Sequence, residues 1–502
     1  MTHDSAADPA TLDQTGPGNQ TRPGDKNSPG DQTSPEPVRQ SLKGKVFEGG
    51  ALLMGRQLVS MALSIVGLLV ITRIIGPAAY GPYVAALSIC QYAQNLGQAG
   101  VGAFLVRAPG EVSDRTYDVA TTVLLISSGG LMLVLEASLG LIAKWMPLPG
   151  LSQLLAVMLV TVVLQTLTVA ASAKLERALD FRRVAMIETV GQLLYYGVGL
   201  PLVLLGFGVW SLVAGWFLQQ LFLCVGFHVV ARYRPRLVWD KAIVRSMLAY
   251  TSGYAASDWL WQLRGLINPL IVGHFLPPEA VGQVGLAIRM LELLSFTKTI
   301  AYRLSVAVLA KVQHEPAKLV EATTDGMRLQ TLALGPVLLG FSWLGGFILS
   351  LVFGPRWEPV MLVYPYLALS YLTNAQFNMH SSVLYVLHRN WAVSWFHIVH
   401  IVLFAGAAWV AVDRFGLVGY GYAEMVALLG YPVIHRSVRH LVGSPQYGLS
   451  GLWWASVAIG LFWRQLGLWA IAVPFVALLC PPSLRQLKLY YGMFAGRRRH
   501  AV

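Results

Sequence analysis

Residues 49–87 read GGALLMGRQLVSMALSIVGLLVITRIIGPAAYGPYVAAL, which is two apolar segments joined by the turn GPAAYG at 76–81. A helix needs roughly 20 apolar residues to cross a bilayer, and segments of this length recur as far as residue 480. Of the 502 residues, 55% are hydrophobic and only 12% are charged. A soluble chain of this length would cover its cores with more charge. The sequence therefore predicts an all-α polytopic membrane protein.

Twelve predicted spans precede a final apolar region that Arg464 and Gln465 interrupt. The spans are 50–72, 83–106, 119–143, 151–173, 184–205, 209–230, 248–272, 282–308, 329–353, 360–387, 391–412 and 416–438, and the final region is 451–480. Lys and Arg collect in cytoplasmic loops. Twenty of them lie before the first span or after even-numbered spans, against four in the alternate loops. Both termini are therefore expected in the cytoplasm, which favours about 14 spans, twelve core helices plus a short C-terminal hairpin.

The predicted domains follow from composition. Within residues 1–45, turn-forming units such as PGDKNS and PGDQTS repeat from Pro17 to Gln40, and such a sequence cannot build a core, so disorder is expected at 1–45. The rest divides into a six-helix lobe at 46–232, a cytoplasmic linker at 233–246, a second six-helix lobe at 247–440, one or two helices at 451–480 and a basic cytoplasmic tail at 481–502. The net charge of +13 is assigned to this topology, and no nucleic-acid binding is expected.

A weak internal repeat relates the two lobes at an offset of 201 residues. GPAAYG at 76–81 aligns with PPEAVG at 277–282, and Gln57 falls on Asp258. The polar stripe Ser88-Gln91-Asn95-Gln98 aligns with a charged stripe inside IRMLELLSFTKTIAYRLSV at 288–306, and each stripe keeps to one helical face. Six spans per lobe give both lobes the same orientation, with a pseudo-two-fold axis along the membrane normal. Two parallel lobes of this kind form a transporter architecture.

Charges inside the spans are the main candidates for function. An Arg at the bilayer centre costs roughly 2.5–3.5 kcal/mol on insertion scales, so such residues should face the interior or water. The candidate cavity cations are Arg56, Arg264, Arg289, Lys298 and Arg303. Alternatively, Arg289 pairs with Glu292 three residues on, and Arg56 and Arg303 extend to the lipid headgroups.

Other ionisable residues support fewer conclusions. Asp258 and Glu292 are candidate sites for H⁺ or Na⁺, the only cofactors expected. Glu424, alone in an apolar span, is interpreted as a packing group. His397 and His400 stand one turn apart without an acid or cysteine to complete a metal site, so no metal is expected.

The chain resembles the polysaccharide flippases of the MOP superfamily, the Wzx-like oligosaccharide exporters, and most of all the branch of colanic-acid-type exporters. Residues 49–87 carry this resemblance, together with ALDFRRVAMIE (178–188), LLGFGVWSLVAG (204–215), RPRLVWD (234–240) and HFLPPEAVGQVGLAIRMLELL (274–294). The resemblance covers about residues 45 to 480 and implies a V-shaped fold of two lobes around a central cationic cavity.

The substrate that the resemblance implies is an oligosaccharide linked to undecaprenyl diphosphate, moved from the inner to the outer leaflet of the bacterial cytoplasmic membrane by alternating access. The candidate cations would bind the diphosphate, because Arg pairs its planar fork with phosphate oxygens. Tyr254, Trp261 and Tyr302 would stack on sugar rings. Membrane lipids and polysaccharide assembly proteins are the expected partners. The alternatives are a multidrug exporter of related architecture, a membrane glycan polymerase and a membrane scaffold. Nothing in the sequence suggests an enzyme.

Overall fold

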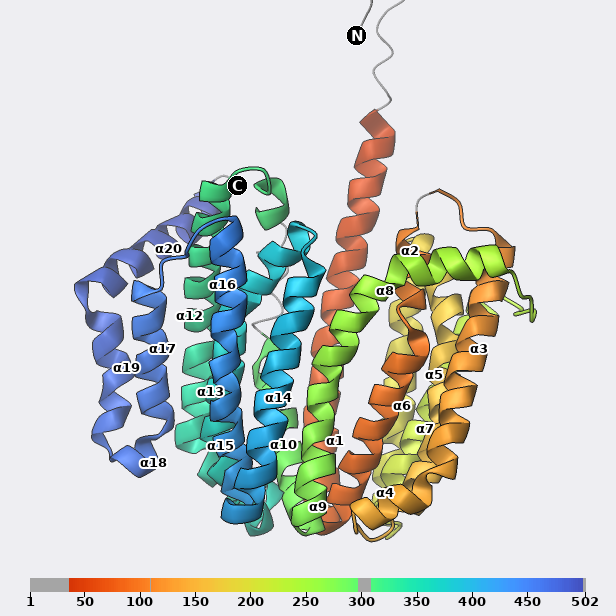
Figure 1. Ribbon diagram of the computed structural model, residues 1–502, viewed down its shortest axis with the longest axis horizontal. Coiled ribbons are helices and arrows are strands. Elements are labelled where there is room, and N and C mark those ends of the chain that lie inside the picture. The colour runs from red at the N-terminus through yellow and green to blue at the C-terminus, as the bar shows by residue number, and fades with distance from the viewer. Residues whose placement is uncertain (1–35, 109, 297–307, 500–502) are drawn as a thin grey trace, which may run out of the picture. The chain divides into compact units, whose positions relative to one another are not determined.

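A computed structural model describes residues 36–108, 110–296 and 308–499, with side chains from Leu63 onward except those of 252–254, 257 and 493–499. Every regular element in these ranges is a helix, and Glu48–Val502 forms one compact unit (Figure 1). The α-helices are α1 (Glu36–Gln98), α2 (Val101–Arg107), α3 (Asp114–Ala137), α4 (Leu139–Trp145), α5 (Leu151–Arg177), α6 (Phe181–Leu204), α7 (Trp210–Val230), α8 (Lys241–Leu263), α9 (Gly273–Phe275), α10 (Pro278–Leu294), α12 (Pro316–Ile348), α13 (Val360–Val386), α14 (Asn390–Phe415), α15 (Leu417–Ala427), α16 (Tyr431–Leu441), α17 (Gly448–Leu461), α18 (Trp463–Leu466), α19 (Trp469–Leu479) and α20 (Pro481–Arg499). Short 3₁₀ or π-helical segments are η1 (Arg264–Leu266), η2 (Asn268–Val272), η3 (Leu349–Phe353), η4 (Pro355–Trp357) and η5 (Leu428–Gly430).

The described helices confirm the predicted fold class. Eight helical segments are each long and apolar enough to cross a membrane, and a ninth candidate joins α19 to the start of α20 across a 62° bend. The eight are Leu63–Gln98, Asp114–Ala137, Leu151–Arg177, Phe181–Leu204, Trp210–Val230, Pro316–Phe353, Asn390–Phe415 and Leu417–Leu441. The chain is thus a multi-pass, all-α membrane protein, while the total of about 14 spans stays a prediction.

The turn GPAAYG breaks α1 where the sequence places the boundary between the first two spans. Gly76 has a φ of 75° and a ψ of 170°, outside the helical region, and Pro77 follows directly. Positive φ carries little steric penalty for glycine because it has no Cβ. The first predicted span is therefore the first arm of α1, and the second comprises the second arm of α1 and most of α2.

The repeated turn brings its two copies together in a reciprocal contact. A Cβ on Gly81 would collide with the carbonyl oxygen of Pro278, and a Cβ on Gly282 would collide with the carbonyl oxygen of Pro77. Both pairs are related by the predicted offset of 201 residues. A two-fold axis between duplicated segments produces this kind of reciprocal contact. It supports the internal duplication, and the division into two parallel lobes otherwise stays a prediction.

Helix α8 packs against helices from both the N-terminal and the C-terminal parts of the chain. Its neighbours are α2 and α3 on one side and α14 on the other, as Figure 1 shows. Asp240 caps its first turn, accepting hydrogen bonds from the backbone N–H groups of Ala242 (3.0 Å) and Ile243 (3.4 Å). The bond from Ile243 holds the pKa of the Asp240 carboxyl below its usual value. After Leu263 the α-helix changes to 3₁₀ and then π-helical turns, so the predicted span at 248–272 is irregular in its second half.

Both terminal segments are helical where the structure describes them. Helix α1 begins at Glu36, so residues 36–45, predicted as disordered, are helical. Residues 481–499, predicted as a basic tail, form α20, since Pro481 starts a new helix after the bend. The apolar region 451–480 contains most of α17, the short α18 and α19, and α17 and α19 lie side by side (Figure 1).

Candidate functional site

Hydrogen bonds join the helix ends near the two repeated turns, on the side predicted to be outside. The indole N–H of Trp357 donates to the Thr72 carbonyl (3.2 Å), and that of Trp145 donates to the Leu270 carbonyl (3.0 Å). Arg73 donates to the carbonyl of Leu351 (2.8 Å). Each bond links residues more than a hundred positions apart. These contacts connect distant segments of the chain at this end of the molecule.

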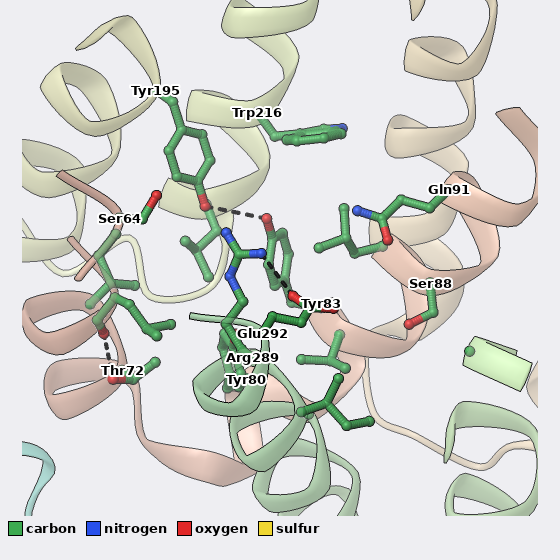
Figure 2. Close-up of a pocket in the computed structure, with 18 of the residues that line it drawn as sticks. Ser64, Thr72, Tyr80, Tyr83, Ser88, Gln91, Tyr195, Trp216, Arg289 and Glu292 are labelled. Carbon is green, nitrogen blue, oxygen red and sulfur yellow. Dashed lines mark hydrogen bonds and ion pairs between the residues drawn. The ribbon is translucent and has the colours of Figure 1, made fainter. Parts of the chain in front are cut away.

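A cavity of about 600 Å³, here called the outer cavity, lies beneath the repeated turns. Figure 2 shows its wall, in which the guanidinium of Arg289 lies among the phenol rings of Tyr83 and Tyr195. The hydroxyls of these two tyrosines are 3.3 Å apart. Its polar lining consists of Ser64, Thr72, Tyr80, Tyr83, Ser88, Gln91, Gln192, Tyr195, Tyr196, Trp216, Gln219, Gln262, Asn268, Arg289 and Glu292. Helices α1, α6, α7 and α10 supply most of these residues, so hydroxyl, amide and aromatic groups dominate.

The charge of the outer cavity is balanced. Nη1 of Arg289 lies 3.0 Å from a carboxylate oxygen of Glu292, and both side chains are about half exposed. They are the only cation and the only acid among the described residues that line this cavity. Arg289 thus both lines the cavity and forms the local ion pair, so the two interpretations do not exclude each other. Within the described residues, the outer cavity is polar rather than cationic.

A second cavity of about 410 Å³, the middle cavity, continues along α1. It shares Ser88, Gln91 and Gln262 with the outer cavity and adds further amides from α1. These are Gln94, Asn95 and Gln98. The structure therefore places all four members of the predicted polar stripe, Ser88, Gln91, Asn95 and Gln98, along one continuous polar surface.

A hydrogen bond joins the lining of the middle cavity to that of a third, inner cavity of about 940 Å³. The amide of Asn95, which lines the middle cavity, donates to Asp258, which lines the inner one, at 2.6 Å. The indole of Trp259 also donates to the Asn95 carbonyl, at 3.1 Å. The inner cavity lies toward the predicted cytoplasmic side, where Arg107 and Trp261 contribute to its wall. Asp258, predicted as an ion site, is thus held by an amide at a junction.

Arg264 is not among the residues that line the three cavities. Its Nη2 is 2.7 Å and 2.6 Å from the two carboxylate oxygens of Glu424 on α15, and 3.2 Å from the Ser370 hydroxyl. Glu424 is 1% exposed and Arg264 is 16% exposed. Glu424, interpreted from the sequence as a lone packing acid, is therefore one half of a buried ion pair. The partner comes from a distant span, and sequence spacing does not reveal such a pair.

The remaining predicted residues lie outside the described part of the chain. These are the side chains of Arg56, Gln57, Tyr254, Lys298, Tyr302 and Arg303. Helices α6 and α7 also line the outer cavity, which the sequence did not predict. Their main residues there are Gln192, Tyr195, Trp216 and Gln219. Isolated glutamines in otherwise apolar spans were the available signal, since a lone amide in lipid needs a polar environment.

Comparison with known proteins identifies relatives in surface-polysaccharide synthesis. A family model described as "Polysaccharide biosynthesis protein" matches residues 70–362. The chain is 25% identical over 321 residues to the succinoglycan biosynthesis transport protein ExoT of Rhizobium meliloti, covering 62% of this chain and 63% of that protein. It is 28% identical over 199 residues to the amylovoran biosynthesis protein AmsL of Erwinia amylovora, covering 39% of this chain and 49% of that protein. Both alignments thus span less than two thirds of the relative.

Two solved structures share the fold. The lipid II flippase MurJ in an inward closed conformation superimposes with a TM-score of 0.71 at 12% identity, covering 89% of this chain and all of MurJ. An inward-facing MATE family multidrug transporter of the MOP superfamily superimposes with a TM-score of 0.60 at 15% identity, covering 76% of this chain and 95% of that one. At such identities the likeness establishes the fold alone, which this chain shares with both structures.

Proposed function

The chain belongs to the polysaccharide biosynthesis protein family, and from this premise we propose that it is a flippase for lipid-linked oligosaccharides. It would move repeat units carried on a polyprenyl diphosphate, undecaprenyl diphosphate in bacteria, from the inner to the outer leaflet of the cytoplasmic membrane. Surface polysaccharide synthesis would then continue outside, with polysaccharide assembly proteins as partners. Both termini would lie in the cytoplasm, as the distribution of Lys and Arg predicts.

The observation that carries this proposal is the polar surface shared by the outer and middle cavities. Amide side chains both donate and accept hydrogen bonds, as sugar hydroxyls do. Gln192 and Gln219 face this space from α6 and α7, while Gln91, Asn95 and Gln98 face it from α1. Polar residues within membrane spans are expensive and mark substrate paths. An uncharged, hydroxyl-rich ligand matches this lining better than a cationic drug does, since no unpaired acid lies among its described residues.

The diphosphate requires positive charge, for which the candidates remain Arg56, Arg264, Arg289, Lys298 and Arg303. Of these, Arg289 lies in the outer cavity and is held by Glu292. We propose that the others complete a cationic region next to the glycan surface. Transport would proceed by alternating access, in which the contacts near the repeated turns open as the inner side closes. Asp258 and Glu292 are the proposed sites for H⁺ or Na⁺.

A pair of adjacent glutamines on α7 tests the glycan surface. Gln219 lines the outer cavity, whereas its neighbour Gln220 is buried elsewhere. Gln219→Leu should cut polysaccharide export at least tenfold and cause lipid-linked oligosaccharide to accumulate in the inner leaflet. Gln220→Leu, a matched change on the same helix, should leave export within about twofold at equal protein level. Equal export by both variants would remove Gln219 from the proposed surface.

A further inference from the structure

The Arg264–Glu424 ion pair uses only part of the hydrogen-bonding capacity of the guanidinium. All three hydrogen bonds of the guanidinium use one nitrogen, Nη2. Its Nε is buried and has no hydrogen-bond partner within the described residues. Strong Arg–carboxylate pairs are frequently bidentate, with two parallel N–H···O hydrogen bonds from two nitrogens. Arg264 therefore keeps hydrogen-bonding capacity that Glu424 does not use.

The backbone that carries Arg264 borders the substrate space. Gly265, the next residue, lines both the outer and the middle cavity, and no atom lies within 4 Å of the position where its Cβ would be. Arg264 begins the 3₁₀ segment η1, and the π-helical segment η2 follows. Mid-span changes of this kind often mark hinges. A rotation in this irregular part of the span would carry the guanidinium from Glu424 toward the cavities.

Glu424 would still have a partner after Arg264 left. The hydroxyl of Ser370 on α13 donates to its Oε2 at 2.8 Å. One neutral hydrogen bond is nonetheless a poor substitute for a cation around a carboxylate that is 1% exposed. The carboxylate would therefore draw Arg264 back once a competing anion departed.

We propose that Glu424 is an internal counter-ion that competes with the substrate diphosphate for Arg264. In one state, Arg264 pairs with Glu424, as it does in the structure. In the loaded protein, the diphosphate takes Arg264, and its release returns Arg264 to Glu424. Neither state leaves Arg264 without an anion in the low-dielectric interior. This inference rests on the proposed function and gives Arg264 and Glu424 alternating partners within it.

Binding of a simple ligand pair tests the competition. The probes are farnesyl diphosphate and, as an uncharged match, farnesyl glucoside, each titrated against the purified full-length protein in detergent. Glu424→Gln removes the competing charge and should tighten farnesyl diphosphate binding at least tenfold, with farnesyl glucoside unchanged within twofold. The same variant should slow polysaccharide export, because release of the diphosphate loses its competitor.

A second variant keeps the test decisive if Glu424→Gln does not fold. The double change Arg264→Gln with Glu424→Gln replaces the pair by two neutral amides and leaves no buried charge. It should weaken farnesyl diphosphate binding at least tenfold relative to the unaltered protein. Unchanged diphosphate affinity in either variant would overturn the inference, and so would an equal change for both probes. If the unaltered protein binds neither probe, the proposed function fails together with it.

Discussion

The reciprocal contact between the two repeated turns, at Gly81 and Gly282, should control how tightly the outer side closes. Replacing either residue with alanine adds one methyl group at a position where the carbonyl oxygen of Pro278 or Pro77 already lies. A backbone oxygen cannot turn aside as a side chain can, so the two segments must separate. Added methylene-sized groups in packed sites typically cost about 1–3 kcal/mol. If that cost falls on the state with a closed outer side, the ratio of closed to open protein drops by roughly 5- to 150-fold.

Thiol accessibility measures this ratio. Ser88 lines the outer and middle cavities, so Ser88→Cys reports on entry from outside. The background should lack the three native cysteines. A membrane-impermeant maleimide applied to right-side-out vesicles should label this cysteine faster in the Gly81→Ala and Gly282→Ala backgrounds, by a factor within that range.

Gly129 provides the control for added methyl groups. It lies within α3, and no atom lies within 4 Å of its potential Cβ, so Gly129→Ala should leave the labelling rate unchanged. If Gly81→Ala and Gly282→Ala label no faster than Gly129→Ala, the reciprocal contact does not hold the outer side closed.

Two further predictions concern bonds that join distant parts of the fold. Trp357→Phe removes the indole donor to the Thr72 carbonyl and should lower the free energy of unfolding by about 1–3 kcal/mol. The measurement is the Tm of the purified protein, and an unchanged Tm would show that this bond does not stabilise the fold. Asp258→Asn keeps a polar partner for Asn95 but loses the carboxylate, whose charge-assisted bonds are about twice as strong as neutral ones. Labelling of Gln98→Cys from the cytoplasmic side should rise in this variant, and an unchanged rate would show that the Asn95 bond does not separate the two cavities.

The sequence predicts the fold well where the signal is local. Apolar length places most helices, and a helical repeat places Gln91, Asn95 and Gln98 on one face, where the structure has them. The turn at Gly76 is also visible in sequence, because a Gly-Pro step between apolar runs interrupts a helix. These features depend only on neighbouring residues along one helix.

The partners of the intramembrane charges could not be predicted, since they depend on packing between distant spans. Arg264 looks unpaired in sequence, and Glu424 lies 160 residues further on. For Arg289, the sequence left two alternatives, a cavity cation or a local ion pair with Glu292. The i, i+3 spacing permits the pair but does not decide whether it faces a cavity. The residues from α6 and α7 were missed for the same reason: Tyr195 and Trp216 are ordinary in an apolar helix until its orientation is known.

Transport itself is tested most directly by reconstitution. The purified protein is placed in liposomes with a fluorescent oligosaccharide linked to a polyprenyl diphosphate, and a membrane-impermeant quencher reports the leaflet that holds the label. We expect that the protein moves the labelled lipid between leaflets, that Gln219→Leu slows this movement at least tenfold, and that a fluorescent cationic dye is not transported. Liposomes in which the dye crosses and the lipid-linked oligosaccharide does not would contradict the proposed function.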